Sequence, residues 1–309
     1  MSALVVVLAL AADLVAGDPP NRYHPVAWIG AILAGGRAAL ARGGRVRLVL
    51  AGGMLVIATA GVAACAAWAV DVAAASLGPA GVLLQALALK SLFAVRGLVR
   101  AANAVAAQLT TGDVTAARAA VGRDLVSRGT ATLDEAQVAS ATIESVAENL
   151  TDSVLAPVLC FLFFGLPGAA VYRVANTADA MLGYREGVLE YFGKVAARLD
   201  DLLNLLPARI AALALVLAAP LSGADMAAAL RVLRRDHGRT ASPNAGWTLA
   251  AMAGALGVTL EKPGVYRLGD GRPPQAKDIA RSLRIFRTAV GLSLGASVAT
   301  ALVVACGYG

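Results

Sequence analysis

The sequence is short of charged and aromatic residues. Only 15% of its 309 residues are Asp, Glu, Lys or Arg, and 5% are Phe, Trp or Tyr, whereas about 25% of the residues in soluble domains are charged. This shortage excludes an ordinary soluble domain. The hydrophobic share of 58% excludes intrinsic disorder, which needs few apolar residues and a high net charge. The apolar residues are mainly Ala, Val and Leu, which favours closely packed helices in a membrane.

The sequence also has little that would serve a disulfide, a soft-metal site or nucleic acid. Its three cysteines, Cys65, Cys160 and Cys306, lie in apolar runs without Cys or His at ligand spacing, which is typical of buried thiols. The net charge is +7, but no dense Lys/Arg run appears, so we expect no nucleic-acid partner. No P-loop or glycine-rich nucleotide motif is present.

Long apolar runs predict an all-α, polytopic helical integral membrane protein. A bilayer core of about 30 Å takes about 20 apolar residues, and four runs qualify as spans: 1–17, 48–70, 79–99 and 288–309. Two further segments, 153–172 and 210–224, are short or interrupted by proline, and we expect them to be broken or re-entrant. Strand patterns are absent, so the whole chain, 1–309, is expected to form one membrane domain.

The distribution of Lys and Arg predicts how the chain is oriented. Cytoplasmic loops hold most basic residues, which assigns 18–47, 100–152 and 225–287 to the cytoplasm. The stretch 173–209 is also basic, and it would lie outside if 153–172 crossed the membrane once. Re-entrant segments at 153–172 and 210–224 satisfy the rule better. They would surround a polar site that faces the cytoplasm.

Acidic and amide side chains gather around these two broken segments. Glu144, Glu148 and Asp152 follow the helical spacing i, i+4, i+8 beside an apolar run, where uncompensated charge is costly. Three Asn/Asp pairs with a spacing of three lie nearby. A single pair more often caps a helix, but the cluster favours Mg²⁺, which prefers oxygen ligands. The predicted metal ligands are Glu144, Asn149, Asp152, Asn176, Asp179, Asp201 and Asn204.

Basic residues accompany the carboxylates. Arginine forks suit phosphate and carboxylate groups, and the turn Ser242–Asn244 should open a helix whose free N–H groups attract anions. Anchoring of cytoplasmic loops would explain the same residues and stays an open alternative. The predicted substrate- and phosphate-binding residues are Arg123, Arg173, Arg185, Lys194, Arg198, Arg209, Arg234, Arg235, His237 and Asn244.

Two local signals concern single turns. His24 is one of only two histidines and shares a proline-rich turn, 17–25, with Asp18. A lone histidine is more often structural, but this pair could transfer protons. The segment Thr132–Glu135 matches a capping box and predicts a helix start.

These motifs together resemble the adenosylcobinamide-phosphate synthase family of cobalamin biosynthesis (CobD/CbiB type). The resemblance runs from one end of the chain to the other, and its block from Glu144 to Arg209 is long and specific. The stretches that carry it are 17–19, 24–30, 122–124, 144–152, 167–173, 176–185, 192–193, 197–209, 242–246 and 261–266.

The resemblance implies a multi-pass enzyme of the bacterial inner membrane with its active site facing the cytoplasm. Such enzymes join adenosylcobyric acid, a corrinoid, to (R)-1-aminopropan-2-ol O-phosphate through an amide bond and yield adenosylcobinamide phosphate. ATP and Mg²⁺ are the expected cofactors. The lipid bilayer and other membrane-bound enzymes of late B12 assembly are the expected partners.

Amide formation from a carboxylate requires an activated carboxyl group, such as an acyl phosphate, together with cationic clamps on the phosphoryl group. The expected catalytic residues are His24, Asp18, Glu148 and Asp200. Of these, His24 or a carboxylate would deprotonate the amine. Two other classes stay open: a Mg²⁺-dependent intramembrane prenyl-type transferase, and a corrinoid transporter or non-catalytic scaffold of a membrane B12 assembly complex.

Overall fold

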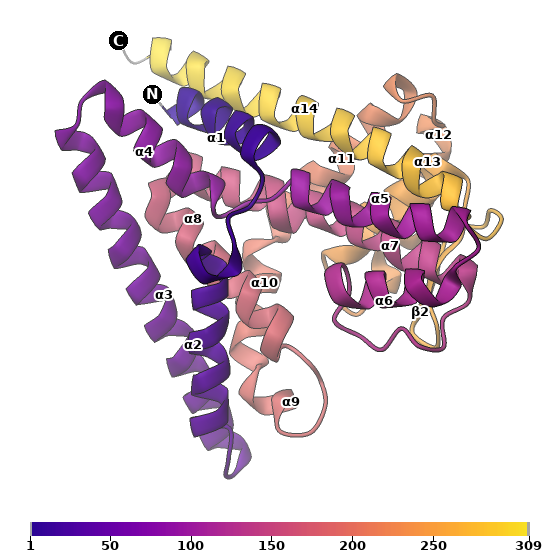
Figure 1. Ribbon diagram of the computed structural model, residues 1–309, viewed down its shortest axis with the longest axis horizontal. Coiled ribbons are helices and arrows are strands. Elements are labelled where there is room, and N and C mark those ends of the chain that lie inside the picture. The colour runs from indigo at the N-terminus through magenta and orange to yellow at the C-terminus, as the bar shows by residue number, and fades with distance from the viewer. Residues whose placement is uncertain (1, 308–309) are drawn as a thin grey trace. The chain divides into compact units, whose positions relative to one another are not determined.

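The computed structural model describes residues 2–307 (Figure 1). They divide into two compact units. Unit 1 comprises 2–94, Ala156–Asn204 and 297–307, and unit 2 comprises Val95–Leu155 and Leu205–Ala296. Residues 1, 308 and 309 lie outside the described part. The single membrane domain expected over 1–309 stays a prediction.

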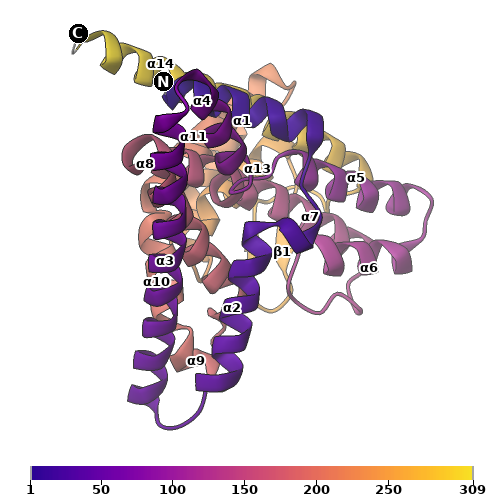
Figure 2. The same cartoon turned by 60° about the vertical axis from the view of Figure 1, so that its left-hand side comes forward.

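Unit 1 is built from helices around the long helix α3. Its elements are α1 (Ser2–Ala16), the short 3-10 helix η1 (Asn21–Tyr23), α2 (Pro25–Leu40), α3 (Arg45–Ser76), α4 (Pro79–Lys90), α8 (Ala156–Leu182), α9 (Leu189–Phe192) and α10 (Lys194–Leu203). Helices α2 and α3 lie side by side (Figure 2). Their buried residues, among them Leu33 and Val56, pack with Val174 of α8 and Phe192 of α9 in one apolar core. This core fixes the helices that carry the polar residues of unit 1.

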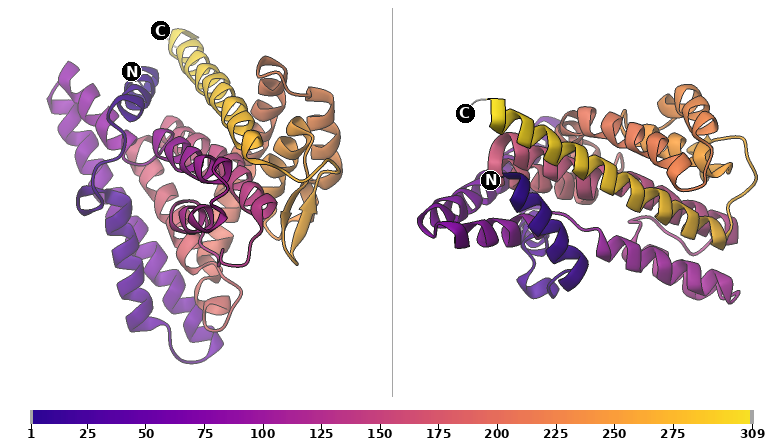
Figure 3. Two further views of the ribbon diagram at one scale, coloured as in Figure 1. Left: turned by 45° about the vertical axis from the view of Figure 1, so that its right-hand side comes forward. Right: turned by 90° about the horizontal axis from the view of Figure 1, so that it is seen from above.

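Unit 2 packs helices around the buried helix α7. Its elements are α5 (Arg96–Thr110), α6 (Val114–Asp124), α7 (Glu135–Leu150), the π-helix η2 (Thr151–Leu155), α11 (Leu205–Leu221), α12 (Met226–Asp236), the 3-10 helix η3 (His237–Arg239), α13 (Ala245–Leu256), β1 (Leu260–Lys262), β2 (Tyr266–Leu268) and the first part of α14 (Ala276–Gly307). Strands β1 and β2 form an antiparallel hairpin, drawn as arrows in Figure 3, in which Leu260 pairs with Leu268 and Lys262 with Tyr266. The hairpin contacts α7.

The helices confirm an all-α membrane protein. In the described part of the chain, two helical stretches, Arg45–Ser76 and Glu135–Leu182, are long and apolar enough to cross a bilayer, each with a mean hydropathy of 2.2. They become three if α10 and α11, which flank Asn204, form one broken span. Four shorter helices, α1, α2, α4 and α13, are also apolar.

The predicted break in 153–172 is present. Helix α8 loses helical geometry at Gly165, whose φ of 68° and ψ of −165° lie where only glycine is comfortable. Pro167 follows two residues later and cannot supply the backbone N–H that a regular helix would need. A Cβ atom at Gly165 would also come within 3.3 Å of Asp71 Oδ2.

Several helix predictions differ from the structure. The helix expected over 79–99 ends at Lys90, and residues 91–95 separate it from α5. The segment 18–47, which its basic residues assign to the cytoplasm, contains α2 packed on α3. The helix expected over 288–309 lies within α14 as far as Gly307 and then leaves the described residues. The orientation of every segment stays a prediction.

Three smaller predictions need correction. Helix α7 is capped by Asp134, which forms the capping box with Gln137, rather than by Thr132. Cys65 is exposed on α3 instead of buried. The hairpin was not predicted, because two strands of three residues are too short to show a period of two.

We expect Gly52→Ala to destabilise unit 1. A Cβ atom at Gly52 would lie 1.8 Å from the carbonyl oxygen of Phe192, which is backbone and cannot yield as a side chain would. Overpacking of this kind should lower the free energy of unfolding by about 2 kcal/mol, measured as a lower midpoint in thermal unfolding. Gly61→Ala on the same helix is the matched control, because nothing lies within 4 Å of its Cβ position. Equal stability of the two variants would contradict this packing.

Candidate functional site

Two helices of unit 1 bring five polar side chains into one hydrogen-bonded network. Tyr172, Arg173 and Asn176 lie on α8, and Asp200 and Asn204 lie four residues apart at the end of α10, so that each set shares a helix face. We call these five residues the Asp200 network. Asp200 is its centre, because Asn176 Nδ2 donates to Oδ1 at 3.3 Å and Asn204 Nδ2 donates to Oδ2 at 3.0 Å.

The other end of each amide in the Asp200 network is also engaged. Tyr172 donates its hydroxyl to Asn204 Oδ1 at 2.9 Å, and Arg173 Nη1 donates to Asn176 Oδ1 at 3.1 Å. Arg173 Nε donates to the carbonyl of Leu92 at 2.7 Å. A guanidinium can only donate and a carboxylate can only accept, so the orientation of Asn176 follows from its partners. The network therefore links a buried arginine to a carboxylate through one amide.

The remaining acidic residues predicted in unit 1 lie close to this network in sequence. Asp201 follows Asp200 directly, and Arg198 Nη1 lies 3.6 Å from Asp201 Oδ2. The Arg198 side chain is 71% exposed, so its guanidinium can reach a ligand in solution. Asp179 is half-buried on α8, where a Cβ atom at Gly183 would come within 2.0 Å of its Oδ1.

The predicted Mg²⁺ ligands are divided between the two units. Asn176, Asp179, Asp201 and Asn204 belong to unit 1, and Glu144, Asn149 and Asp152 belong to unit 2. Within the described residues, no three His, Cys, Asp or Glu side chains are grouped as metal ligands. Mg²⁺ commonly keeps waters and substrate phosphates and takes one or two carboxylates. In unit 1, both oxygens of Asp200 already accept from Asn176 and Asn204, and Asp201 follows Asp200 in the chain.

A second polar cluster in unit 1 surrounds a lysine that the sequence analysis did not select. Lys90, at the end of α4, is 5% exposed, and its Nζ donates to Asp18 Oδ1 at 2.6 Å. Asp13 of α1 is fully buried, and its Oδ1 lies 3.7 Å from the same Nζ. His24 Nε2 lies 3.7 Å from Asp18 Oδ1. We call Asp13, Asp18, His24 and Lys90 the Asp18 cluster.

The Asp18 cluster sets the ionisation of Asp18 and the tautomer of His24. Hydrogen bonding from His24 and from Lys90 lowers the pKa of the Asp18 carboxyl from 3.8 to about 2, although partial burial opposes this shift. The backbone N–H of Val26 donates to His24 Nδ1 at 3.2 Å, where the ring caps α2. The proton of the neutral imidazole must then sit on Nε2, which faces Asp18.

We expect this cluster to make stability depend on pH in the acid range. The pKa of Asp18 is lower in the folded state, so its contribution to stability is fully present above about pH 4 and is lost as the pH falls towards 2. Asp18→Asn should therefore cost about 2 kcal/mol at neutral pH and about half as much at pH 3. Thermal unfolding of both proteins at pH 7 and pH 3 measures the difference, and an unchanged difference would contradict the assignment.

In unit 2, Glu144 is held by protein donors on both oxygens. Ser140 donates to Oε1 at 2.7 Å, and Tyr266 of the hairpin donates to Oε2 at 2.6 Å. Arg128 Nη2 lies 3.6 Å from Oε2. Burial and the charge of Glu144 raise the pKa of the Tyr266 hydroxyl well above its usual range, so Tyr266 remains a donor. Glu148 is half-buried on α7 and acts electrostatically on Tyr266.

The other predicted ligands of unit 2, Asn149 and Asp152, lie beside and in the π-helix η2. The amide of Asn149 donates to the Ser145 carbonyl at 2.8 Å and accepts from the hydroxyl of Ser153 at 2.6 Å. Asp152 is half-buried in η2. With both ends of its amide engaged, Asn149 does not present a free ligand atom in this arrangement.

Three of the predicted anion-binding residues meet at Trp247 in unit 2. The guanidinium of Arg209 lies 4.7 Å above the Trp247 ring, and the ring of His237 lies 4.5 Å from it. Arg209 also donates to Asn244 Oδ1, and Asn244 is 5% exposed at the start of α13. The Ser242–Asn244 turn does open a helix, as predicted.

The remaining basic residues are exposed or paired. Arg185, Lys194 and Arg234 are exposed. Arg123 forms an ion pair with Asp124 at 2.6 Å. Arg235 bridges the buried Asp236 at 2.8 Å and the exposed Asp270 at 2.7 Å.

Sequence reasoning missed Lys90, Tyr172, Arg128 and Tyr266, each of which contacts a predicted residue from a distant part of the chain. A signal for one of these contacts was present: Asp13 is the only charged residue in an otherwise apolar helix. A buried carboxylate in such a helix requires a cation, and Lys90 supplies it.

Known proteins resemble this chain along nearly its whole length. The family model described as "CobD/Cbib protein" matches residues 6–286. A protein of Dehalococcoides mccartyi named "Cobalamin biosynthesis protein CobD" is 41% identical over 288 residues, which cover 93% of each chain. Two proteins named "Probable cobalamin biosynthesis protein CobD" are each 42% identical. One, from Methanothermobacter thermautotrophicus, covers 86% of each chain, and the other, from Thermococcus kodakarensis, covers 93% of this chain and 92% of its own.

No solved structure matches the chain significantly. The match of the family model and the identities of the relatives both extend over both units. The chain therefore belongs to the CobD/Cbib protein family.

Proposed function

We propose that the protein acts in cobalamin biosynthesis as an ATP- and Mg²⁺-dependent ligase of the inner membrane. It would join adenosylcobyric acid to (R)-1-aminopropan-2-ol O-phosphate and produce adenosylcobinamide phosphate. The main support for this proposal is that the chain matches the CobD/Cbib family model over residues 6–286. Its relatives are named for cobalamin biosynthesis. The buried, charged networks around Asp200 and Asp18 support an enzyme, because ionisable groups in apolar helical proteins are costly to retain without a function.

The proposed reaction has two steps, phosphoryl transfer and amide formation. The terminal phosphoryl group of ATP passes to the corrinoid carboxylate, giving an acyl phosphate and ADP. The amine nitrogen then attacks the acyl carbon, phosphate leaves with the C–O bond electrons, and the nitrogen loses a proton. Mg²⁺ would neutralise phosphate charge, with Asp200 and Asp201 as the carboxylates that suit it.

Residues of unit 1 suit the phosphoryl step. Arg198 is exposed and lies beside Asp201, so it can approach the phosphate oxygens that Mg²⁺ would leave free. Arg173 is buried and donates to Leu92 and Asn176, so its role would be to position Asp200 through Asn176. In this arrangement Arg198 would bind the phosphate, and Arg173 would position Asp200.

Residues of the Asp18 cluster suit removal of the amine proton. Asp18 faces His24 Nε2, which leaves Nδ1 as the basic nitrogen of the ring. When the Val26 N–H bond to Nδ1 opens, His24 can accept the proton there. The ionised Asp18 would stabilise the imidazolium that forms, as a carboxylate does in a catalytic triad.

The test is an assay of the detergent-purified protein with adenosylcobyric acid, aminopropanol phosphate, ATP and Mg²⁺, read by mass spectrometry. We expect a product with the mass of the amide that requires both ATP and Mg²⁺. Omission of each component in turn is the control. A folded protein that binds the corrinoid and forms no product would overturn the ligase proposal and favour a scaffold.

A further inference from the structure

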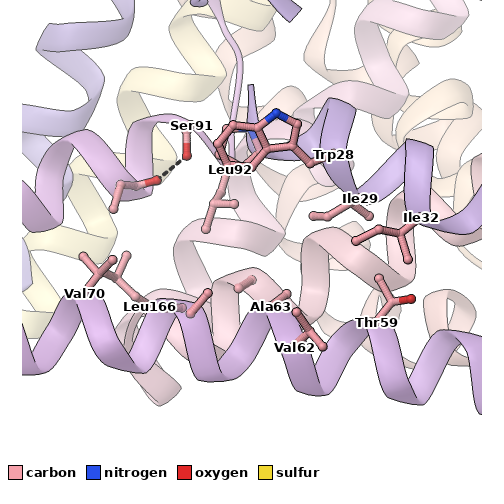
Figure 4. Close-up of a pocket in the computed structure, with 15 residues that line it drawn as sticks. Trp28, Ile29, Ile32, Thr59, Val62, Ala63, Val70, Ser91, Leu92 and Leu166 are labelled. Atoms are coloured by element: carbon pink, nitrogen blue, oxygen red, sulfur yellow. Dashed lines mark hydrogen bonds between the residues drawn. The ribbon is translucent and has the colours of Figure 1, made fainter. Parts of the chain in front are cut away.

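Unit 1 contains an apolar cavity of about 300 Å³ between α2, α3, α4 and α8 (Figure 4). Its floor consists of buried side chains, including Ile29 at 7% exposure and Leu166 at 1%. Its mouth consists of the exposed side chains of Trp28, Ile32 and Val62, at 53%, 47% and 63%. The cavity therefore opens on the outer face of α2 and α3.

The polar side chains that line the cavity have no donor left for a polar ligand. Three lining side chains carry polar atoms, and each donates to a backbone carbonyl. Trp28 Nε1 donates to Arg22 at 2.9 Å, Thr59 to Leu55 at 2.7 Å, and Ser91 to Ala88 at 2.7 Å. A buried water needs two to four polar partners, roughly three on average. The cavity is thus suited to hydrocarbon and not to water.

The mouth lies on the face that a bilayer would cover. Helix α3 is a candidate membrane span, and its outer side chains are large, apolar and exposed, as Met54 at 63% and Ile57 at 67% show. The short helix η1 and the first turn of α2 carry the groups typical of a membrane interface. Arg22 stacks on the exposed Tyr23 ring at 4.6 Å, and its carbonyl holds the indole of Trp28 at the mouth.

We propose that this cavity holds one acyl chain of a bilayer phospholipid, whose phosphate lies beside Arg22. The apolar floor of the cavity would contact the acyl chain, and its mouth would open to the lipid. The guanidinium of Arg22 would lie close to the headgroup phosphate. This inference does not rest on the ligase reaction.

The test uses the full chain in vesicles of phosphatidylethanolamine and phosphatidylglycerol that carry a photoactivatable diazirine on one acyl chain. We expect cross-links to concentrate on peptides of α2 and α3 that contain Ile32, Thr59 and Val62. Ala67→Trp fills the cavity from α3. It should lower labelling there about tenfold, which is the effect of excluding two methylene groups from burial.

Ala69→Trp is the matched control, because Ala69 is exposed on the same helix and does not line the cavity. Its labelling should equal that of the unmodified protein. If Ala67→Trp fails to fold, the positions of the cross-links in the unmodified protein decide the question. Labels spread evenly over the outer face of α3, or displacement of the lipid by adenosylcobyric acid, would overturn the proposal.

Discussion

Replacing Asp200 by asparagine is expected to lower amide formation at least about a hundredfold, the scale seen when a positioned electrostatic group is lost from an active site. In the Asp200 network, Asn176 and Asn204 each donate to a different oxygen of Asp200. An amide at position 200 can accept from only one of them, because its NH₂ group would face the other donor. The variant also loses the negative charge next to Asp201. Turnover in the mass-spectrometric assay measures the effect.

Glu190→Gln is the control for Asp200→Asn, because Glu190 is an exposed acid on α9 in the same unit. It makes the same chemical change and should keep full activity. Thermal unfolding of both variants separates a folding defect from a catalytic one. Near-normal turnover of a folded Asp200→Asn protein would show that the network is structural only.

Replacing Lys90 by methionine is expected to cost about 3–5 kcal/mol of stability, the usual penalty for removing one partner of a buried ion pair. Lys90 is the cation between Asp13, which is fully buried, and Asp18. Methionine keeps most of the apolar length of the side chain but removes its charge from the fully buried Asp13 and from Asp18, which His24 still accompanies. Denaturation of the purified protein should show a much lower midpoint.

Two further variants test whether the Lys90 effect is electrostatic. Lys194→Met changes an exposed lysine of the same unit and should leave stability nearly unchanged. Adding Asp13→Asn to Lys90→Met removes one of the stranded charges and should recover part of the loss. If the stability loss of the double variant equals the sum of the losses of the two single variants, Lys90 and Asp13 are not directly coupled.

The fold class was predictable because it depends on local composition. Long uncharged runs favour helices in a membrane. The prolines within 153–172, Pro157 and Pro167, predict an interruption, which the structure places at Gly165. The ends of the helices were less accessible. Helix α4 ends at Lys90 without a glycine or proline there, and the end becomes understandable only once Asp13 and Asp18 are seen around that lysine.

In the candidate site, too, contacts within one helix were predictable from the sequence, and contacts between helices were not. Spacing predicts that Asn176 shares a helix face with Asp179, three residues away, as part of a metal site. The structure pairs Asn176 with Asp200 of another helix. Helical periodicity determines which side chains share a face and does not determine which helix lies opposite that face. For the same reason, the hydrogen bond from Tyr266 to Glu144 could not be predicted from the sequence.

The position of His24 has a consequence for how unit 1 responds to acid. Its imidazole is at once the N-terminal cap of α2 and a member of the Asp18 cluster. A second proton on the ring must go to Nδ1, where it would oppose the N–H of Val26, so protonation and capping exclude each other. The turn that would then loosen contains Pro25 and Trp28, which border the apolar cavity. The same turn therefore holds both the N-terminal cap of α2 and one side of the apolar cavity.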